Sequence, residues 1–174
     1  MSDILTSCVT VCFTGHRSIP EAHALRLPSL LEEQLRALIA RGARNFRAGG
    51  ALGFDTLAAL KVLELREQMP EAGLRLDLYL PCRDQTRGWN EACCRAYDYV
   101  LDHADSFRYI SEQYTSTCML ERDRRMVDGS DVCVAYCTRN QGGSFYTCTY
   151  ALKKDVQLIN LADQLSINHG GTSS

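Results

Sequence analysis

The chain has 174 residues, of which 45% are hydrophobic and 23% charged, and its formal net charge is −2. A chain of this length buries roughly 70% of its unfolded surface as one domain and is too short for two domains of ordinary size. The small net charge gives no general attraction to nucleic acids or anionic lipids, and no apolar run is long enough to span a membrane. We therefore expect one domain whose partner is neither a nucleic acid nor a membrane.

The start of the chain and its cysteines indicate the compartment. Met1–Ile4 lacks the basic start and apolar core of a secretory signal, so we expect a cytoplasmic protein. The nine cysteines are an odd number in a chain larger than small disulfide scaffolds, which favours free thiols. Cys8 and Cys12 are about 13 Å apart if they share a strand, too far to hold one metal ion. We expect no metal site and no required cofactor; Cys82 and Cys118, in or near loops, are either buried or reactive.

Strand-like runs alternate with helix-like runs along the chain. Runs rich in apolar and β-branched residues predict strands at 7–13, 45–48, 74–80, 106–110, 132–136 and 156–161. Apolar residues at helical spacing predict helices at 28–41, 57–63, 89–100, 117–128 and 145–153. We place the domain at 1–162 and a disordered Gly/Ser/Thr-rich tail at 163–174. This alternation predicts an α/β fold with three layers, a mostly parallel sheet of about six strands and helices on both faces.

The glycine-rich stretch Gly49–Thr56 lies between a predicted strand and a predicted helix. Three glycines in five residues let the backbone approach a bound group closely, and the following helix offers unpaired N–H groups. An adenine nucleotide, a sugar phosphate or a pyrophosphate would fit such a turn, and the alternative is a turn that binds nothing. Asp55 stands where a helix N-cap is expected, so its role is either capping or binding.

Two further polar turns follow predicted strands, at Thr14–Arg17 and Thr138–Ser144. Right-handed crossovers bring the carboxyl ends of parallel strands to one edge of the sheet, and a crevice opens there where the strand order reverses. If the first strand lies beside this reversal, all three turns face one crevice. Convergence of two glycine-rich turns is a more specific signal for a phosphate-type ligand than either turn alone.

Single residues near these turns have two possible roles. Trp89 either begins the core face of a helix or stacks on a base. Arg122 falls on the same helical stripe as Met119, at a position where a core residue is expected. A buried guanidinium needs an anionic partner, which would be Asp128, Asp131 or a ligand phosphate.

The motifs together resemble one family, the YpsA-like branch of the SLOG superfamily, which also contains the Lonely-guy phosphoribohydrolases and the DNA-processing protein DprA. The resemblance covers residues 8 to about 161. It rests on motifs in the family's order: Thr14-Gly15-His16-Arg17, Gly49-Gly50-Ala51-Leu52-Gly53-Phe54-Asp55, Pro81 with Gln85 and Trp89, Arg122 with Arg124 to Asp128, Ser130-Asp131, and Gly142-Gly143.

The resemblance implies a Rossmann-like fold with a nucleotide-type pocket, and for several relatives a role in sensing or processing NAD-derived or ADP-ribose-like molecules. It also implies which residues bind the ligand. These are Gly15, His16, Arg17, Gly49, Gly50, Ala51, Gly53, Asp55, Gln85, Trp89, Arg122, Asp128, Gly142, Gly143 and Ser144.

The chain departs from the Lonely-guy hydrolases at the second glycine turn. Those enzymes have a proline before the paired glycines and a glutamate one helix turn later, where this chain has Gln141 and Thr149. Cleavage of an N-glycosidic bond needs a carboxylate near the sugar, so Asp55, Asp128 or Asp131 would have to replace that glutamate.

Three functions follow from these observations. The first is binding or sensing of a nucleotide-derived small molecule, without an assigned reaction. The second is hydrolysis of an N-glycosidic bond in a nucleotide, and the third is a DprA-like scaffold for single-stranded nucleic acid, against which the near-neutral charge argues. Relatives often pair subunits, so a homodimer is a further expectation.

Overall fold

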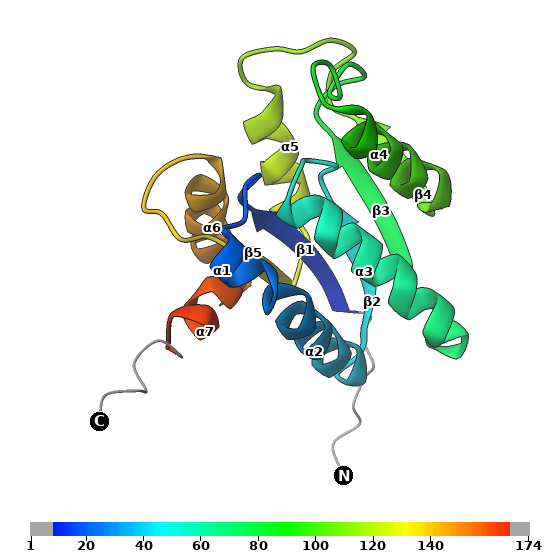
Figure 1. Ribbon diagram of the computed structural model, residues 1–174, viewed down its shortest axis with the longest axis vertical. Coiled ribbons are helices and arrows are strands. Elements are labelled where there is room, and N and C mark those ends of the chain that lie inside the picture. Colours follow the sequence, from blue (N-terminus) through cyan, green and yellow to red (C-terminus); the bar gives the residue numbers. More distant parts are fainter. Residues whose placement is uncertain (1–8, 168–174) are drawn as a thin grey trace.

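The computed structural model describes residues 9–167, which form one parallel sheet with helices on both faces (Figure 1). The strands are β1 (Val9–Gly15), β2 (Ala43–Ala48), β3 (Arg75–Leu80), β4 (Ser106–Tyr109), β5 (Val132–Tyr136) and β6 (Gln157–Asn160). The helices are α1 (Glu21–Ala24), α2 (Leu27–Ala40), α3 (Phe54–Gln68), α4 (Glu91–His103), α5 (Cys118–Val127), α6 (Gly143–Lys153) and α7 (Leu161–Ile167), with a 3-10 turn at Pro70–Ala72.

The strand order is β4-β3-β2-β1-β5-β6, and every pairing in the sheet is parallel. The chain moves outward from β1 to β4 and then returns to place β5 on the other side of β1. The order therefore reverses between β1 and β5, so the first strand lies beside the reversal, which was the condition for the three turns to face one crevice. The carboxyl ends of β1, β2 and β5 carry the three polar turns, so the fold brings them to the same edge.

Alternating side chains of the strands build a core on each face of the sheet. Val11 and Phe13 of β1 pack into the larger core, which α2, α3 and α7 complete (Figure 1). Cys12, between them in sequence, points to the smaller core, where it meets Met126 of α5 and Ala151 of α6. All five residues of β5 are buried, which is typical of a central parallel strand and confirms the predicted position.

All predicted strands and helices are present, with small shifts at their ends, so the predicted α/β class is confirmed. The tail boundary was placed too early. Residues 161–167 form α7, whose Leu161 and Leu165 are four residues apart and both buried against the core. The remainder of the predicted tail, 168–174, lies outside the described residues, as does the start of the predicted first strand.

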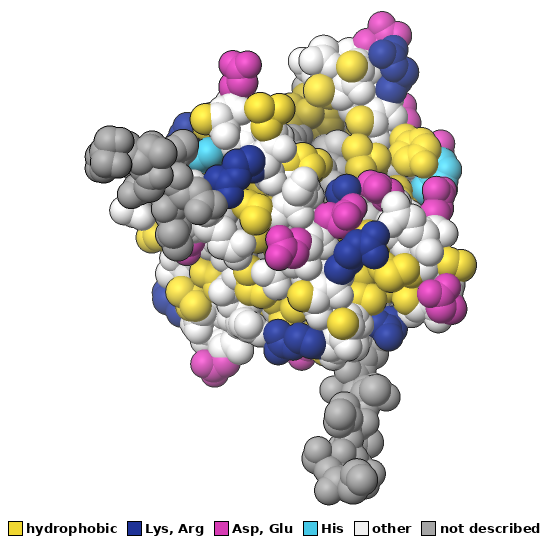
Figure 2. Space-filling view, turned by 60° about the horizontal axis from the view of Figure 1, so that its bottom comes forward, with side chains coloured by type: hydrophobic (Ala, Val, Ile, Leu, Met, Phe, Trp, Pro, Cys, Tyr) yellow, Lys and Arg dark blue, Asp and Glu magenta, His cyan; other side chains and the backbone are white. Residues whose placement is uncertain are grey.

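Surface charges are mixed on the face that Figure 2 shows, where Lys and Arg side chains alternate with Asp and Glu. Within residues 9–167, no helix is both long and apolar enough to cross a membrane. The same residues contain no group of three or more His, Cys, Asp or Glu side chains arranged to hold a metal ion. The eight cysteines in this range are free thiols.

Candidate functional site

The first glycine turn joins β2 to α3 and packs directly on the chain that leaves β1. Gly53 has φ 76°, and a Cβ there would lie 2.3 Å from the carbonyl oxygen of Arg17. The next residue, Phe54, donates its backbone N–H to the carbonyl of His16 at 3.1 Å. A glycine is needed at position 53 because the two backbones are in direct contact there. This contact brings the turn at Gly49–Thr56 against the turn at Thr14–Arg17.

The second glycine turn opens helix α6. Gly142 is the N-cap, with φ 93°, and within residues 9–167 no side chain caps this helix end. The first N–H groups of a helix have no partner within the helix and carry its positive dipole end. Gly143 and Ser144, which supply such groups, both line the cavity described below. This helix end is therefore suited to hold an anion.

Helix α5 connects the two glycine turns through a buried network. Arg122 donates from Nη1 to the carbonyl of Gly49 and from Nε to Asp123 Oδ1 at 2.6 Å. The Thr147 hydroxyl of α6 lies 3.1 Å from Asp123 Oδ2 and 2.9 Å from the carbonyl of Gly143. Arg122, Asp123 and Thr147 are all nearly buried, so this chain of contacts fixes one turn relative to the other.

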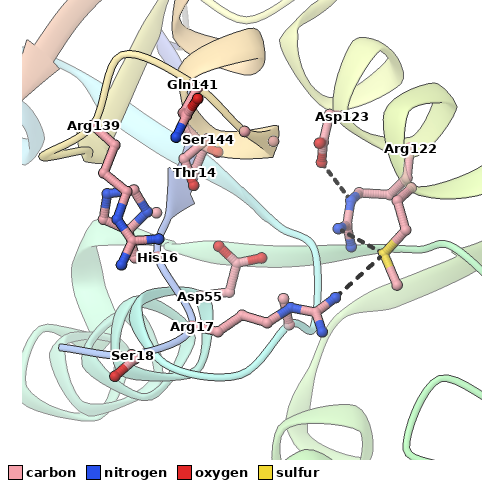
Figure 3. Close-up of a pocket in the computed structure, with 15 residues that line it drawn as sticks. Thr14, His16, Arg17, Ser18, Asp55, Arg122, Asp123, Arg139, Gln141 and Ser144 are labelled. Carbon is pink, nitrogen blue, oxygen red and sulfur yellow. Dashed lines mark hydrogen bonds and ion pairs between the residues drawn. The ribbon is translucent and has the colours of Figure 1, made fainter.

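The turns enclose a cavity of about 410 Å³ (Figure 3). Asp55 is a buried part of the wall and lies in the view between the His16–Arg139 side and the Arg122–Asp123 pair of α5, with Arg17 below it. Arg139 and His16 stand together on a further wall. The full lining is Thr14, Gly15, His16, Arg17, Ser18, Ala51, Asp55, Met119, Arg122, Asp123, Arg139, Gln141, Gly142, Gly143 and Ser144.

Two ionisable groups of this cavity have shifted pKa values. Burial raises the pKa of Asp55 to about 6; the Arg122 charge opposes this shift, and Asp123 adds to it. Burial, with a smaller contribution from the Arg139 charge, lowers the pKa of His16. His16 Nε2 lies 2.8 Å from the backbone nitrogen of Thr138, which donates to it, so the neutral ring carries its proton on Nδ1. At neutral pH the cavity therefore holds a neutral imidazole and a carboxylate close to its titration range.

Comparison with known proteins identifies the family. The YpsA family model, described as the YspA SLOG family, matches residues 12–164 of the chain. The chain belongs to this family.

Other members of the family have similar sequences. UPF0398 protein BH1768 of Halalkalibacterium halodurans is 30% identical over 129 residues, which cover 72% of this chain and 67% of that protein. A UPF0398 protein of Bacillus thuringiensis is 26% identical over 132 residues, 75% of this chain and 71% of that protein. The names of these relatives assign no activity.

Solved structures confirm the Rossmann-like SLOG fold. DprA from Streptococcus pneumoniae matches with a TM-score of 0.60 at 16% identity, over 95% of this chain but only 58% of that protein. DprA from Helicobacter pylori, described for its single-stranded DNA binding mode, matches with a TM-score of 0.60 at 18% identity, over 92% of this chain and 73% of that protein. TM1055 matches at 0.53 and 17% identity, covering 91% of this chain and 81% of that one. At these identities the likeness concerns the fold alone.

The YspA SLOG motifs contribute to the site in three ways. Nine of the predicted residues line the cavity: Gly15, His16, Arg17, Ala51, Asp55, Arg122, Gly142, Gly143 and Ser144. Gly49, Gly50 and Gly53 lie behind this lining and shape the first turn; the Gly49 carbonyl accepts from both Arg122 and Gln85. Gln85 and Trp89 line a neighbouring cavity.

The structure places Asp128, a predicted ligand-binding residue, outside the cavity. Asp128 follows α5 at its far end, where its carboxylate accepts from the Tyr150 hydroxyl at 2.8 Å. Asp131 is also remote, because its carboxylate accepts from the backbone N–H of Thr10 near the start of β1. Arg122 is paired with Asp123 instead, which none of the predicted alternatives named.

Asp55 was expected at the N-cap of α3, but that position belongs to Gly53, and Asp55 lies buried in the first turn of the helix. Its carboxylate receives hydrogen bonds from the backbone of Ala51 and Gly49 in the glycine turn. Sequence reasoning missed other lining residues, among them Thr14, Ser18, Met119 and Arg139. Each of these residues lies within or next to a predicted motif in the sequence. Their positions beside the motifs could have predicted that they line the cavity.

The neighbouring thiols do not form a reactive centre. Cys82 and Cys118 are both 1% exposed. Burial, the largest cause, raises the pKa of Cys82 to about 11, so the thiolate is scarce at neutral pH. Since the thiolate is the nucleophile, the buried alternative holds for Cys82.

Proposed function

We propose that this protein binds a nucleotide-derived small molecule, of the mononucleotide, NAD-derivative or ADP-ribose type, in the cavity between its two glycine turns. The observation that carries this proposal is the uncapped N-terminus of α6, which lies in one cavity with Arg17 and Arg139. Backbone N–H groups and guanidinium groups are the donors that phosphate groups prefer. Asp55 complements them, because a carboxylate in the cavity wall is an acceptor for the hydroxyl groups of a ribose.

The test is thermal unfolding of the protein with AMP, NAD and ADP-ribose. A ligand at one hundred times its dissociation constant adds about 2.7 kcal/mol to the free energy of unfolding, which gives a measurable shift in Tm. We expect Gly143→Val to abolish the shift, because the new side chain adds bulk at the cavity lining while its Cβ meets no atom within 4 Å. The free variant therefore folds.

Arg139→Ala provides the charge test. Within residues 9–167 the Arg139 side chain makes no hydrogen bond or ion pair, so its removal leaves no buried group unpaired. We expect a weaker ligand shift, whereas Arg41→Ala, which removes the same charge at the opposite edge of the sheet, leaves the shift unchanged. Arg122→Ala is unsuitable, since it strips the buried Asp123 of its counter-ion. Absence of a shift with every nucleotide contradicts the proposal.

A labelled oligonucleotide belongs in the same screen. The DprA of H. pylori is described as binding single-stranded DNA, and a phosphodiester backbone carries the same anionic chemistry as a nucleotide. The oligonucleotide could bind in a salt-sensitive way that is lost in Arg139→Ala, while no nucleotide shifts the Tm. That result would show that the ligand of this cavity is a nucleic acid and not a small molecule.

One observation favours a second function, hydrolysis of an N-glycosidic bond. Asp55 has a pKa of about 6 and lines the cavity, which suits a general acid or base at neutral pH. Asp128 and Asp131, the other carboxylates that the sequence offered for this role, are outside the cavity. Release of free base from AMP or NAD, lost in Asp55→Asn, tests this function, since binding alone releases none.

A further inference from the structure

A second cavity of about 320 Å³ adjoins the first. It lies between the loop after β3, which contributes Gln85 and Trp89, and the segment before α5, which contributes Tyr114. Arg17 and Met119 line both cavities. The two spaces therefore meet at these two side chains.

The two side chains that line both cavities contact each other only weakly. Arg17 Nη2 lies 3.8 Å from the sulfur of Met119, and Arg122 Nη2 lies 3.7 Å from the same sulfur (Figure 3). A thioether is a poor acceptor, so a phosphate would readily replace it as the partner of Arg17. Arg17 is exposed and makes no other hydrogen bond or ion pair within residues 9–167.

The chemistry of the second cavity differs from that of the first. Trp89 is half-buried and held edge-on against Tyr97, with 5.7 Å between ring centroids. Tyr114 is 63% exposed, and its hydroxyl makes no hydrogen bond within the described range. Aromatic side chains on separate loops offer surfaces on which a planar ring stacks. Asp84 and Arg87 supply an acceptor and donors for the edge of such a ring.

We propose that the ligand has two ends and occupies both cavities. Its phosphate groups lie against Gly142–Ser144, its aromatic ring lies beside Trp89 and Tyr114, and Arg17 binds the part between them. This inference rests on the proposed function and narrows it to ligands that carry both a phosphate group and an aromatic ring. A sugar phosphate fills only the first cavity and leaves the aromatic side chains without a ligand.

The test measures dissociation constants of ADP-ribose and ribose 5-phosphate by calorimetry. We expect ADP-ribose to bind the wild-type protein more tightly. Tyr114→Ala should weaken ADP-ribose binding about tenfold, the usual effect of removing one stacking partner, and leave ribose 5-phosphate unchanged. Tyr99→Ala is the matched control, because Tyr99 is an exposed tyrosine stacked on His103 of α4 and lines neither cavity.

The outcomes separate this inference from the proposed function. Equal affinities for both compounds, unchanged in Tyr114→Ala but lost in Gly143→Val, would overturn the two-ended ligand and leave the first cavity as a phosphate site. Failure of both compounds to bind would overturn the proposed function and this inference with it.

Discussion

Asp55 combines burial with a position at the lining of the cavity. Its side chain faces opposing influences: burial and Asp123 raise its pKa, whereas Arg122 and the backbone of Ala51 and Gly49 lower it. The balance leaves the pKa at about 6, compared with 3.8 for a free aspartate. The free energy of unfolding must therefore depend on the protonation of this one group.

The pH dependence of stability tests this residue. Because the folded pKa is above the unfolded one, the folded state binds the proton more tightly, and stability falls as pH rises from about 4 to about 6. The loss is about 3 kcal/mol, from 1.36 kcal/mol for each pKa unit. Urea unfolding of the wild type and Asp55→Asn at pH 4 to 7 measures it. The stability of the wild type relative to the variant should decrease over this range; a constant difference would contradict the raised pKa.

Helix α5 is the element that makes the cavity a rigid unit. Its Arg122 holds the first glycine turn through the Gly49 carbonyl, and its Asp123 reaches α6 through Thr147. Arg122 and Asp123 form an ion pair with each other. The positive charges that can bind a ligand are therefore the guanidinium groups of Arg17 and Arg139, which lie on loops. The site thus has a fixed framework and exposed charged groups, an arrangement that lowers the entropic cost of ordering the ligand.

The glycines of the two turns should respond differently to alanine. Gly53→Ala places a side chain in a left-handed conformation and a Cβ 2.3 Å from a backbone oxygen, so we expect a loss of more than about 2 kcal/mol. Gly143→Ala meets open space at a helix start, where a change within about 0.5 kcal/mol is expected. Thermal unfolding of both variants is the measurement. Equal destabilisation would show that the first turn does not pack on the backbone after β1.

At the scale of the whole molecule, the alternation of strands and glycine turns was sufficient to predict the fold and the edge where the site lies. The strands and the parallel sheet follow from local patterns, and the right-handed crossover rule brings the strand ends to one edge, whereas the strand order itself was not predicted. Partners within the site were harder to predict. Adjacent residues of a helix point in different directions, so the sequence offered no reason to expect an ion pair between Arg122 and its neighbour Asp123. Helix α7 was missed because its two core leucines precede a tail rich in glycine and serine.

Asp128 shows why a motif predicts a site only in part. It stands six residues after Arg122 in the same sequence motif, yet it lies at the far end of the helix, away from the cavity, where the Tyr150 hydroxyl donates to it. Asp55 shows the opposite case. Its place in the sequence suggested a helix cap, but its buried carboxylate lines the cavity. In both cases the direction of the side chain, set by packing, decided the role.

Binding of a nucleotide-derived ligand between the two glycine turns can be observed by an NMR titration of the backbone amides with ADP-ribose. We expect the largest chemical-shift changes at Gly142, Gly143, Ser144 and Ala51, with a second group at Trp89 and Tyr114. The amide signal of Arg41, at the opposite edge of the sheet, should stay unchanged. Saturable changes confined to a different surface, or none at millimolar ligand, would show that the ligand does not bind between these turns.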